Sequence, residues 1–317
     1  MRRFLLWRFA QSLVVVIIVS IIVFTMLHLL PGGSARAYLG VKATPDAIRA
    51  FNVANGYNRA FPVQYVLYID HLLHGNLGFS YHLDQSVSSL LILDLPKSAL
   101  LVGLSFIVAV LIAIPVGIAQ ALRRGKLSDH LFTTASFVGY SMPTFWLGML
   151  LIVLFAVQLR WFPPEGPQGA NVSAVLHDPR GLVLPVLTLT IVTVAQFSRF
   201  VRSSAIDIML EDFIRTARAK GVSKRELVAR HLIRNSLLPV VTLIGLSLPG
   251  VLSGAIIVEA LFNYPGMGWL FWTAATSRDY PTLMGFTIVV AVATVAGNLL
   301  ADIAYASLDP RIKYQTR

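Results

Sequence analysis

Few residues of this sequence could carry chemistry. Glu259 and Asp302 are acidic residues at the edges of long apolar runs, and Asn298 lies four residues before Asp302 on the same helical face. An acidic side chain inside a membrane span commonly has a function, because burying its charge is costly. Two interpretations of Glu259 stay open, namely a contact at a gate and a carboxylate with satisfied hydrogen bonds at an interface. For Asp302, the alternatives to a function are exposure to water and an ion pair with a nearby Arg.

Motifs for enzymatic chemistry do not occur in the sequence. The phosphate-binding pattern GxxxxGK[ST] is absent, since Gly125-Lys126 precedes Leu127 and lacks the upstream glycine. HExxH and GxSxG are also absent, and the seven His residues have no metal-ligand spacing. Without any Cys, no thiolate site or disulfide can form. We therefore expect no catalytic residue, no metal site and no cofactor bound by this chain itself.

Charges concentrate in Glu211–Pro239, where ten charged residues occur among twenty-nine although only 13% of the chain is charged. The spacing of apolar residues predicts one helix over residues 206–220 and a second over residues 224–235. Gly221 suits the left-handed end of the first helix, and Ser223 suits the cap of the second. This pattern predicts a rigid helical loop that faces water between two apolar spans.

Thr216–Gly221, read TARAKG, and the following Ile233–Pro239 resemble the EAA loop of ABC importer permeases, in particular the membrane subunits of dipeptide and oligopeptide importers. The family pattern begins Glu-Ala-Ala, whereas this sequence has Arg215 and Thr216 in the first two places, as peptide-type members commonly do. The resemblance implies a coupling loop, residues 206–239, that inserts into a groove of an ATPase subunit. The implied docking residues are Thr216, Ala217, Arg218, Ala219, Lys220, Gly221, Val222 and Ser223. The alternative is a solvated basic loop that only fixes the topology.

Further segments match the same family. They are Gly75–Ser80 (GNLGFS, where the family has GDLG), Val258–Gly268 (VE-x-x-F-x-x-PG-x-G), Arg278–Pro281 (RDYP) and Leu308–Arg311 (a DPR ending). The resemblance places the second and third of these in an extracytoplasmic re-entrant region near the pore mouth. Pro265, Gly266 and Gly268 are predicted there as turn residues, where the backbone leaves the helix.

The composition indicates a membrane protein. Hydrophobic residues make up 56% of the 317 residues, and the mean hydropathy is +0.71. In a soluble chain the net charge of +11 would suggest nucleic acid, but basic residues also accumulate on the cytoplasmic side of membrane proteins. We expect no nucleic-acid partner and contact with membrane lipid.

Six apolar stretches are long enough to cross a hydrocarbon core of ~30 Å as helices. They are Phe9–Leu30, Ser98–Leu122, Thr133–Leu159, Gly181–Ser198, Leu237–Ile257 and Thr282–Leu308. With both termini in the cytoplasm, 18 of the 26 Lys and Arg residues lie inside, as basic residues prefer. A cleaved signal peptide is the rival for the first stretch, but its 22 residues exceed the ~7–15 of a signal-peptide core.

Three parts of the chain are predicted. They are an N-terminal tail with the first span (1–30), an extracytoplasmic insertion (31–97) and a five-helix permease core with the coupling loop (98–317). Inside the insertion, one helix starts at Pro45 and stops at Gly56, a second starts at Pro62 and stops at Gly75, and a short third covers residues 85–93. The insertion either meets a solute-binding protein or only packs on the spans.

Met142, Pro143 and Phe145 lie inside the third predicted span. A helix break there exposes backbone, which membrane proteins tolerate where it lines a cavity. We expect these residues, with Glu259 and Asn298, to line a translocation path. The alternative for Pro143 is a packed kink.

The sequence therefore predicts an all-α polytopic membrane protein with six transmembrane helices, resident in a prokaryotic inner membrane. The resemblance implies a permease subunit that carries di- or oligopeptides or a related small solute. Its implied partners are a homologous second permease, two cytoplasmic ATPase subunits or domains that bind ATP and Mg, and an extracytoplasmic solute-binding protein. The alternative is an ion-gradient-driven carrier or channel that works without an ATPase.

Overall fold

Helices form nearly all of the regular structure. A computed structural model describes residues 2–28, 35–36, 39–40, 43–54, 56–80, 82–237, 243 and 255–308. The strands in this described part are β1 (Phe79–Ser80) and β2 (Gln85–Ser86), which pair antiparallel as a two-residue ribbon. The predicted all-α class is confirmed.

Within the described residues, four helices are long and apolar enough to cross a membrane. They are α1 (Arg2–His28), α5 (Val87–Leu122), α9 (Pro179–Leu210) and α15 (Tyr280–Leu308). These helices confirm a polytopic membrane protein. The predicted fifth span, Leu237–Ile257, lies almost wholly outside the described residues, as does the DPR ending at Leu308–Arg311. The count of six spans therefore stays a prediction.

The third predicted span, Thr133–Leu159, is broken and not continuous. Helix α6 (Leu127–Ser141) is followed by α7 (Thr144–Leu151), which continues as a π-helical segment η1 (Ile152–Gln158), and the two halves are bent by 105°. The residue before a proline avoids the helical conformation, and Met142 accordingly has φ −72° and ψ 130°. Pro143 then starts α7 as its N-cap. The backbone preference at one X-Pro step thus explains the bend.

Two helices continue beyond their predicted ends. Helix α5 has 36 residues and begins at Val87, so the separate short helix expected over residues 85–93 is wrong. Asp94 and Lys97 interrupt the apolar run in the sequence, but they are buried and form an ion pair at 2.8 Å, so the helix passes through them. At ~1.5 Å per residue this helix is about 54 Å long, well above the ~30 Å of a hydrocarbon core.

Helix α9 likewise continues past the predicted end at Ser198 to Leu210. Arg199 and Arg202 suggested that the span ends in water at this point, but their side chains contact residues of α6. Arg202 pairs with Asp129, and the Arg199 guanidinium lies over the ring of Phe137. The predicted helix over residues 206–220 is accordingly divided, because Glu211 adopts φ −66° and ψ 146° between α9 and the next helix.

The remaining helices are short. They are α3 (Pro45–Ala54), α4 (Phe61–Leu73), α8 (Val172–Leu176), α10 (Asp212–Ala219), α11 (Lys224–Glu226), the π-helical η2 (Leu227–Ile233), α13 (Ile256–Leu261) and α14 (Met267–Ser277). Helices α3 and α4 confirm the two predicted helices of the insertion. Positive φ values of 70° at Gly56 and 75° at Gly75 follow their ends, as predicted.

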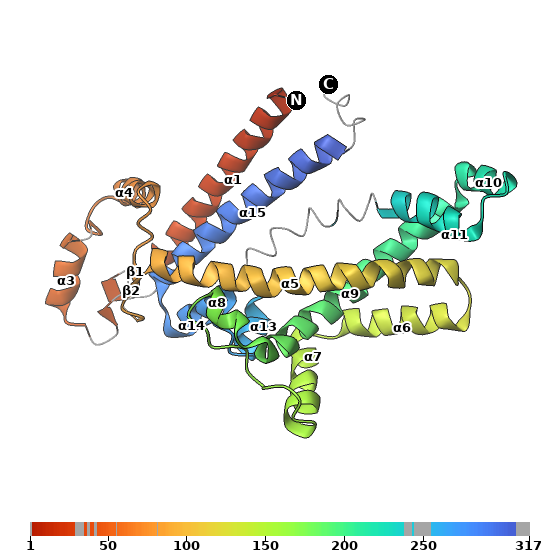
Figure 1. Ribbon diagram of the computed structural model, residues 1–317. Helices are drawn as coiled ribbons and strands as arrows, with labels where there is room; N and C mark the ends of the chain where they lie inside the picture. Colours follow the sequence, from red (N-terminus) through yellow and green to blue (C-terminus); the bar gives the residue numbers. More distant parts are fainter. Residues whose placement is uncertain are drawn as a thin grey trace.

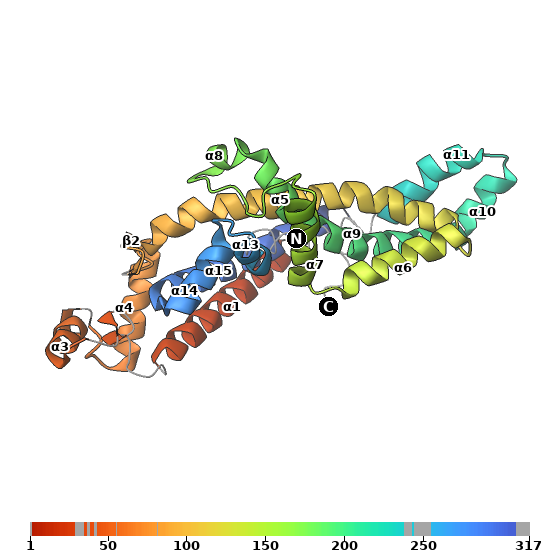
Figure 2. The same cartoon turned by 90° about the horizontal axis from the view of Figure 1, so that it is seen from below.

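The molecule is elongated, with α5 and α9 side by side along it (Figures 1 and 2). Figure 1 shows α3 and α4 of the insertion at one end, and α10 and α11 of the coupling loop at the other. Helix α1 runs beside α15 and carries many exposed apolar side chains, as a lipid-facing helix does. The two parts predicted for opposite membrane faces therefore lie far apart.

A core cluster fastens α5 to α9 near the coupling loop. Its buried members are Ala113, Ile118 and Ala121 of α5, Phe197, Val201 and Ala205 of α9, and Leu232 of η2. The two backbones approach closely at Gly117, where an added Cβ would lie 2.6 Å from the Cβ of Val201. Small residues at this crossing allow such an approach. The coupling loop is therefore mounted on the α5–α9 pair.

Candidate functional site

The coupling loop is a compact helical protrusion. Helix α10 folds back on η2 through a small apolar cluster of Ile214, Ala217 and Leu227. Gly221 has a φ of 79°, which few other residues adopt, and its N–H donates to the carbonyl of Arg218 at 3.0 Å. These contacts confirm the predicted helical loop with its glycine turn.

The predicted cap at Ser223 is also present. Its hydroxyl accepts a hydrogen bond from the backbone N–H of Glu226 at 3.3 Å, as an N-cap does. The carboxylate of Glu226 does not complete a capping box, since it pairs with Arg230 at 2.8 Å. The second half of the loop begins as α11 and then widens into the π-helical η2. The predicted helix over residues 224–235 is therefore present, with a π-helical segment in its middle.

Most of the predicted docking residues are accessible. Exposed members are Thr216, Arg218, Ala219, Lys220, Gly221 and Ser223, while Val222 is half-buried and Ala217 is buried. The buried Ala217 packs against Leu227, so the exposed face of α10 rests on a small apolar cluster. This arrangement presents a small rigid surface to solvent.

The charge of this surface is positive. Arg218, Lys220, Lys224 and Arg225 are exposed. Such a face favours an acidic partner surface and offers no group arranged for catalysis.

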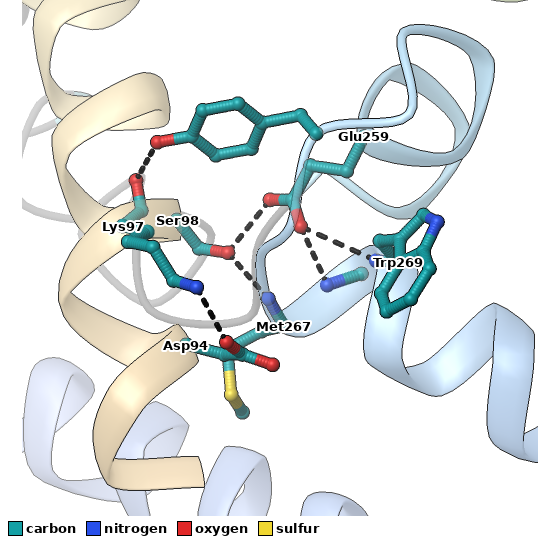
Figure 3. A network of polar contacts seen from close by, with 8 residues as sticks. Asp94, Lys97, Ser98, Glu259, Met267 and Trp269 are labelled. Atoms are coloured by element: carbon teal, nitrogen blue, oxygen red, sulfur yellow. Dashed lines mark hydrogen bonds and ion pairs between the residues drawn. The ribbon is translucent and has the colours of Figure 1, made fainter. Parts of the chain in front are cut away.

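A second site lies where α13 and α14 pack on α5, and Figure 3 shows its contacts. The side chain of Glu259 is fully buried. Its carboxylate accepts hydrogen bonds from the hydroxyl of Ser98 at 2.8 Å and from the N–H of Gly268 at 2.7 Å. The N–H groups of Ala255 and Trp269 complete the set at 3.1 and 3.4 Å. These hydrogen bonds favour the interpretation of Glu259 as a carboxylate with satisfied hydrogen bonds at an interface.

Glu259 acts as a cap for α14. The first N–H groups of a helix have no partner within it and carry partial positive charge. Gly268 and Trp269 donate theirs to the Glu259 carboxylate, and Met267 donates its N–H to the hydroxyl of Ser98 at 2.7 Å. Burial raises the pKa of Glu259, while hydrogen bonds from Ser98 and the backbone oppose that rise.

The glycines of this segment serve close packing. A Cβ on Gly268 would lie 2.5 Å from the Cα of Ile256. Gly268 is the second residue of α14, so the prediction that it lies in a turn is wrong. Gly266 is the N-cap of that helix.

Sequence reasoning missed the α5 side of this site. Ser98 links Glu259 to α5, and the Tyr264 hydroxyl donates to the carbonyl of Lys97 at 2.8 Å. Asp94 and Lys97 form their buried ion pair on the same stretch of α5 (Figure 3). One available signal was the i, i+3 spacing of opposite charges in an apolar context.

A third site joins the insertion to the start of α15. Asp279 is 5% exposed and accepts hydrogen bonds from the hydroxyls of Ser80 and Thr282, the latter at 2.7 Å. The predicted segments Gly75–Ser80 and Arg278–Pro281 thus meet in space.

The remaining predicted path residues lie at the bend between α6 and α7 and on α15. Met142 is half-buried, and Pro143 and Phe145 are exposed. Met142 also packs against the apolar cluster that contains Leu147. Asn298 is exposed on α15, and the side chain of Asp302 lies outside the described ones. The first three residues lie within four positions of one another at this bend.

Within the described residues, no group of three or more acidic or His side chains is arranged to hold a metal ion.

Two descriptions of known protein families match the chain. "Binding-protein-dependent transport system inner membrane component" matches residues 113–314, and the N-terminal part of such membrane components matches residues 1–102. Together they cover nearly all of the chain.

Curated relatives match over their full lengths. The oligopeptide transport system permease protein AppB of Bacillus subtilis is 36% identical over 316 residues, which are 99% of this chain and 100% of that protein. A putative peptide permease protein of Brucella ovis is 37% identical over 320 residues, with 99% of each chain covered. The glutathione transport system permease protein GsiC of Salmonella typhimurium is 36% identical over 315 residues, with 99% and 100% covered.

Proposed function

Since the chain belongs to the binding-protein-dependent transport system inner membrane components, the permease subunits of ABC importers, we propose that it forms half of a translocation path for a peptide-sized solute. It is a multi-pass membrane protein of the inner membrane and a transport subunit, not itself an enzyme. An ion-gradient-driven carrier, the alternative from the sequence, does not fit this family.

The observation that carries the proposal is the rigid, exposed and basic coupling loop at the end of α9. Residues Thr216–Ser223 dock there on a cytoplasmic ATPase subunit. The exposed Arg218 and Lys220 support this role, since complementary charge steers partners together. A loop braced by its own apolar cluster also transmits force better than a flexible one would.

The coupling loop also supports an orientation of the chain in the membrane. The coupling loop and both termini are cytoplasmic, and the insertion is extracytoplasmic. Support comes from the loop and the insertion lying at opposite ends of the molecule (Figure 1). The excess of Lys and Arg on the proposed cytoplasmic side points the same way.

The path lies between this chain and a homologous second permease. Met142, Pro143 and Phe145 line it on this side, with Asn298 contributed by α15. Partial exposure of the α6–α7 bend supports this assignment. We leave Glu259 out of the proposed path, because its carboxylate accepts hydrogen bonds from Ser98 and Gly268 within the protein.

The cargo is a di- or oligopeptide or a related small solute such as glutathione. Relatives that carry oligopeptide and glutathione in their names support this class. An extracytoplasmic solute-binding protein delivers the cargo, and two ATPase subunits or domains bind ATP and Mg. Closure of these ATPases on ATP moves the coupling loop and hydrolysis resets it, and no cofactor is needed in this chain.

A glycine substitution tests the proposal. Gly221→Val forces a β-branched residue into a φ of 79°, so we expect uptake of labelled glutathione or trialanine to fall while ATP hydrolysis continues. Gly40→Val is the matched control, since its φ is also 79° and an added Cβ meets nothing within 4 Å at either position. The proposal fails if the complex contains no ATPase, or if Gly221→Val transports as well as the unaltered chain.

A further inference from the structure

A partly buried ion pair joins α6 to α9 near the coupling loop. The Arg202 guanidinium donates two hydrogen bonds to the Asp129 carboxylate, from Nε to Oδ1 and from Nη2 to Oδ2, both at 2.9 Å. The Asp129 side chain is 3% exposed and that of Arg202 is 28% exposed. Such a two-bond arrangement fixes orientation as well as distance. It therefore constrains how α6 can move against α9.

Asp129 also organises the start of α6. Its carboxylate accepts the backbone N–H of Gly125 at 3.1 Å and the hydroxyl of Thr133 at 3.4 Å. It lies in the first turn of α6, where an acidic side chain opposes the positive helix end. One carboxylate thus joins the preceding turn, α6 and α9.

Three further contacts join the same pair of helices toward the α6–α7 bend. The hydroxyls of Ser136 and Ser198 lie 3.4 Å apart. The Arg199 guanidinium lies 4.4 Å from the ring centre of Phe137 and 5.2 Å from that of Tyr140. These contacts follow α6 along its length, so α6 and α9 form one unit that ends at Met142.

Helix α9 also holds the coupling loop. The Ser204 hydroxyl donates to the carbonyl of Ser236 at 2.9 Å, and Leu232 of η2 is buried against α5 and α9. Any displacement of the loop therefore acts directly on α9. Arg202 lies between the loop and the bend.

We propose that Asp129 and Arg202 are positioning residues that make α6 follow α9 when the coupling loop is displaced, so that the movement reaches the α6–α7 bend. This inference rests on the proposed function, in which the loop receives the force of an ATPase. Neither residue contacts cargo. Their role is to keep two packed helices in one rigid arrangement, as transmission between distant sites requires.

The test uses the assembled importer and a probe at the bend. The chain contains no Cys, so Met142→Cys supplies a single thiol. In the otherwise unaltered complex, we expect Mg-ATP to change the rate of labelling by N-ethylmaleimide. Asp129→Asn should reduce that ATP-induced change about fivefold or more, because the charged pair is lost. Asp207→Asn is the matched control, since Asp207 is exposed on α9.

Two further variants distinguish a loss of movement passed from α9 to α6 from a simple loss of folding. Arg202→Lys keeps the charge but loses the two-bond geometry, so we expect a smaller ATP response with normal assembly. The exchanged pair, Asp129→Arg with Arg202→Asp, should recover more of the response than either single change. ATPase bound per permease is measured in every variant as the readout of assembly.

The outcomes are distinct. If no ATPase co-purifies with the unaltered chain, the proposed function fails and this inference falls with it. If the ATPase binds but Mg-ATP leaves Met142→Cys labelling unchanged, only the inference is overturned. The same holds if Asp129→Asn and Arg202→Lys both assemble and keep the full response.

Discussion

Ser80 donates a hydrogen bond to the buried carboxylate of Asp279, although 199 positions separate them in the sequence. Ser80 belongs to β1 of the insertion, and Asp279 precedes α15. The hydroxyl of Ser80 also accepts the N–H of Leu83 at 3.0 Å, so it fixes the turn between the two strands. One side chain thus anchors the insertion to the membrane-spanning core.

Removing this anchor is expected to destabilise the protein. In Ser80→Ala, a buried carboxylate loses a donor, which costs about 1–3 kcal/mol. Thermal unfolding in detergent should shift to lower temperature, and proteolysis within the insertion should become faster. Thr276→Ala is the control, because that exposed hydroxyl bonds only carbonyls of its own helix. Equal stability of the two variants would contradict the anchoring role.

The Ser98–Glu259 contact is expected to show strong coupling. Every group that reaches the carboxylate is a donor, so the amide of Glu259→Gln places an N–H against another donor. Ser98→Ala removes one donor from a buried carboxyl group, and each change should cost about 1–3 kcal/mol. A double-mutant cycle on the unfolding free energy should give a coupling of about 1 kcal/mol or more. Additive effects of the two changes would argue against the contact.

Gly268→Ala is expected to disturb the packing of α14 on α13. The added Cβ would lie 2.5 Å from the Cα and 2.7 Å from the N of Ile256, and backbone cannot move aside as a flexible side chain can. Overpacking of this kind costs about 1–3 kcal/mol of unfolding free energy. Gly139→Ala on α6 is the matched control, since its nearest neighbour would lie at 3.5 Å, an ordinary contact. If both variants unfold at the same temperature, the close approach is not as described.

Reversing the charge of the coupling loop should weaken its binding to the ATPase. Arg218→Glu with Lys220→Glu replaces two exposed cations, and we expect Kd for the isolated ATPase to rise about tenfold or more, about 1.4 kcal/mol. Raising the salt concentration should reduce the difference, because exposed charges are screened. Arg123→Glu with Arg124→Glu makes the same change of charge in the turn before α6 and should leave Kd unchanged. Equal Kd values for all three proteins would place docking elsewhere.

Local chemistry in the sequence predicted the local structure well. The ends of α3 and α4 follow from glycines within one turn of each helix, and the coupling-loop turn follows from Gly221 and Ser223. Such predictions succeed because the interacting groups lie a few residues apart. Apolar length likewise located α1, α5, α9 and α15, since a hydrocarbon core demands helices of that length.

Contacts between distant segments were not predictable in this way. Ser98 and Glu259 are 161 positions apart, and nothing near either residue indicates the other. The lengths of α5 and α9 were misjudged because a hydropathy pattern does not show that the charged residues of these helices have ion-pair partners. The partner of Lys97 lies only three residues away, but the partner of Arg202 is on another helix.

Cysteine accessibility tests the predicted path at the α6–α7 bend. Phe145 is 48% exposed and Leu147, two residues later, is 7% exposed, and the chain has no Cys of its own. A thiol must ionise to react with a maleimide, which requires contact with water and not with lipid or protein. In the assembled importer we therefore expect a membrane-impermeant maleimide to label Phe145→Cys about tenfold or more faster than Leu147→Cys. Labelling of Phe145→Cys as slow as that of Leu147→Cys would mean that the bend faces lipid or the second permease, and would remove Met142, Pro143 and Phe145 from the path.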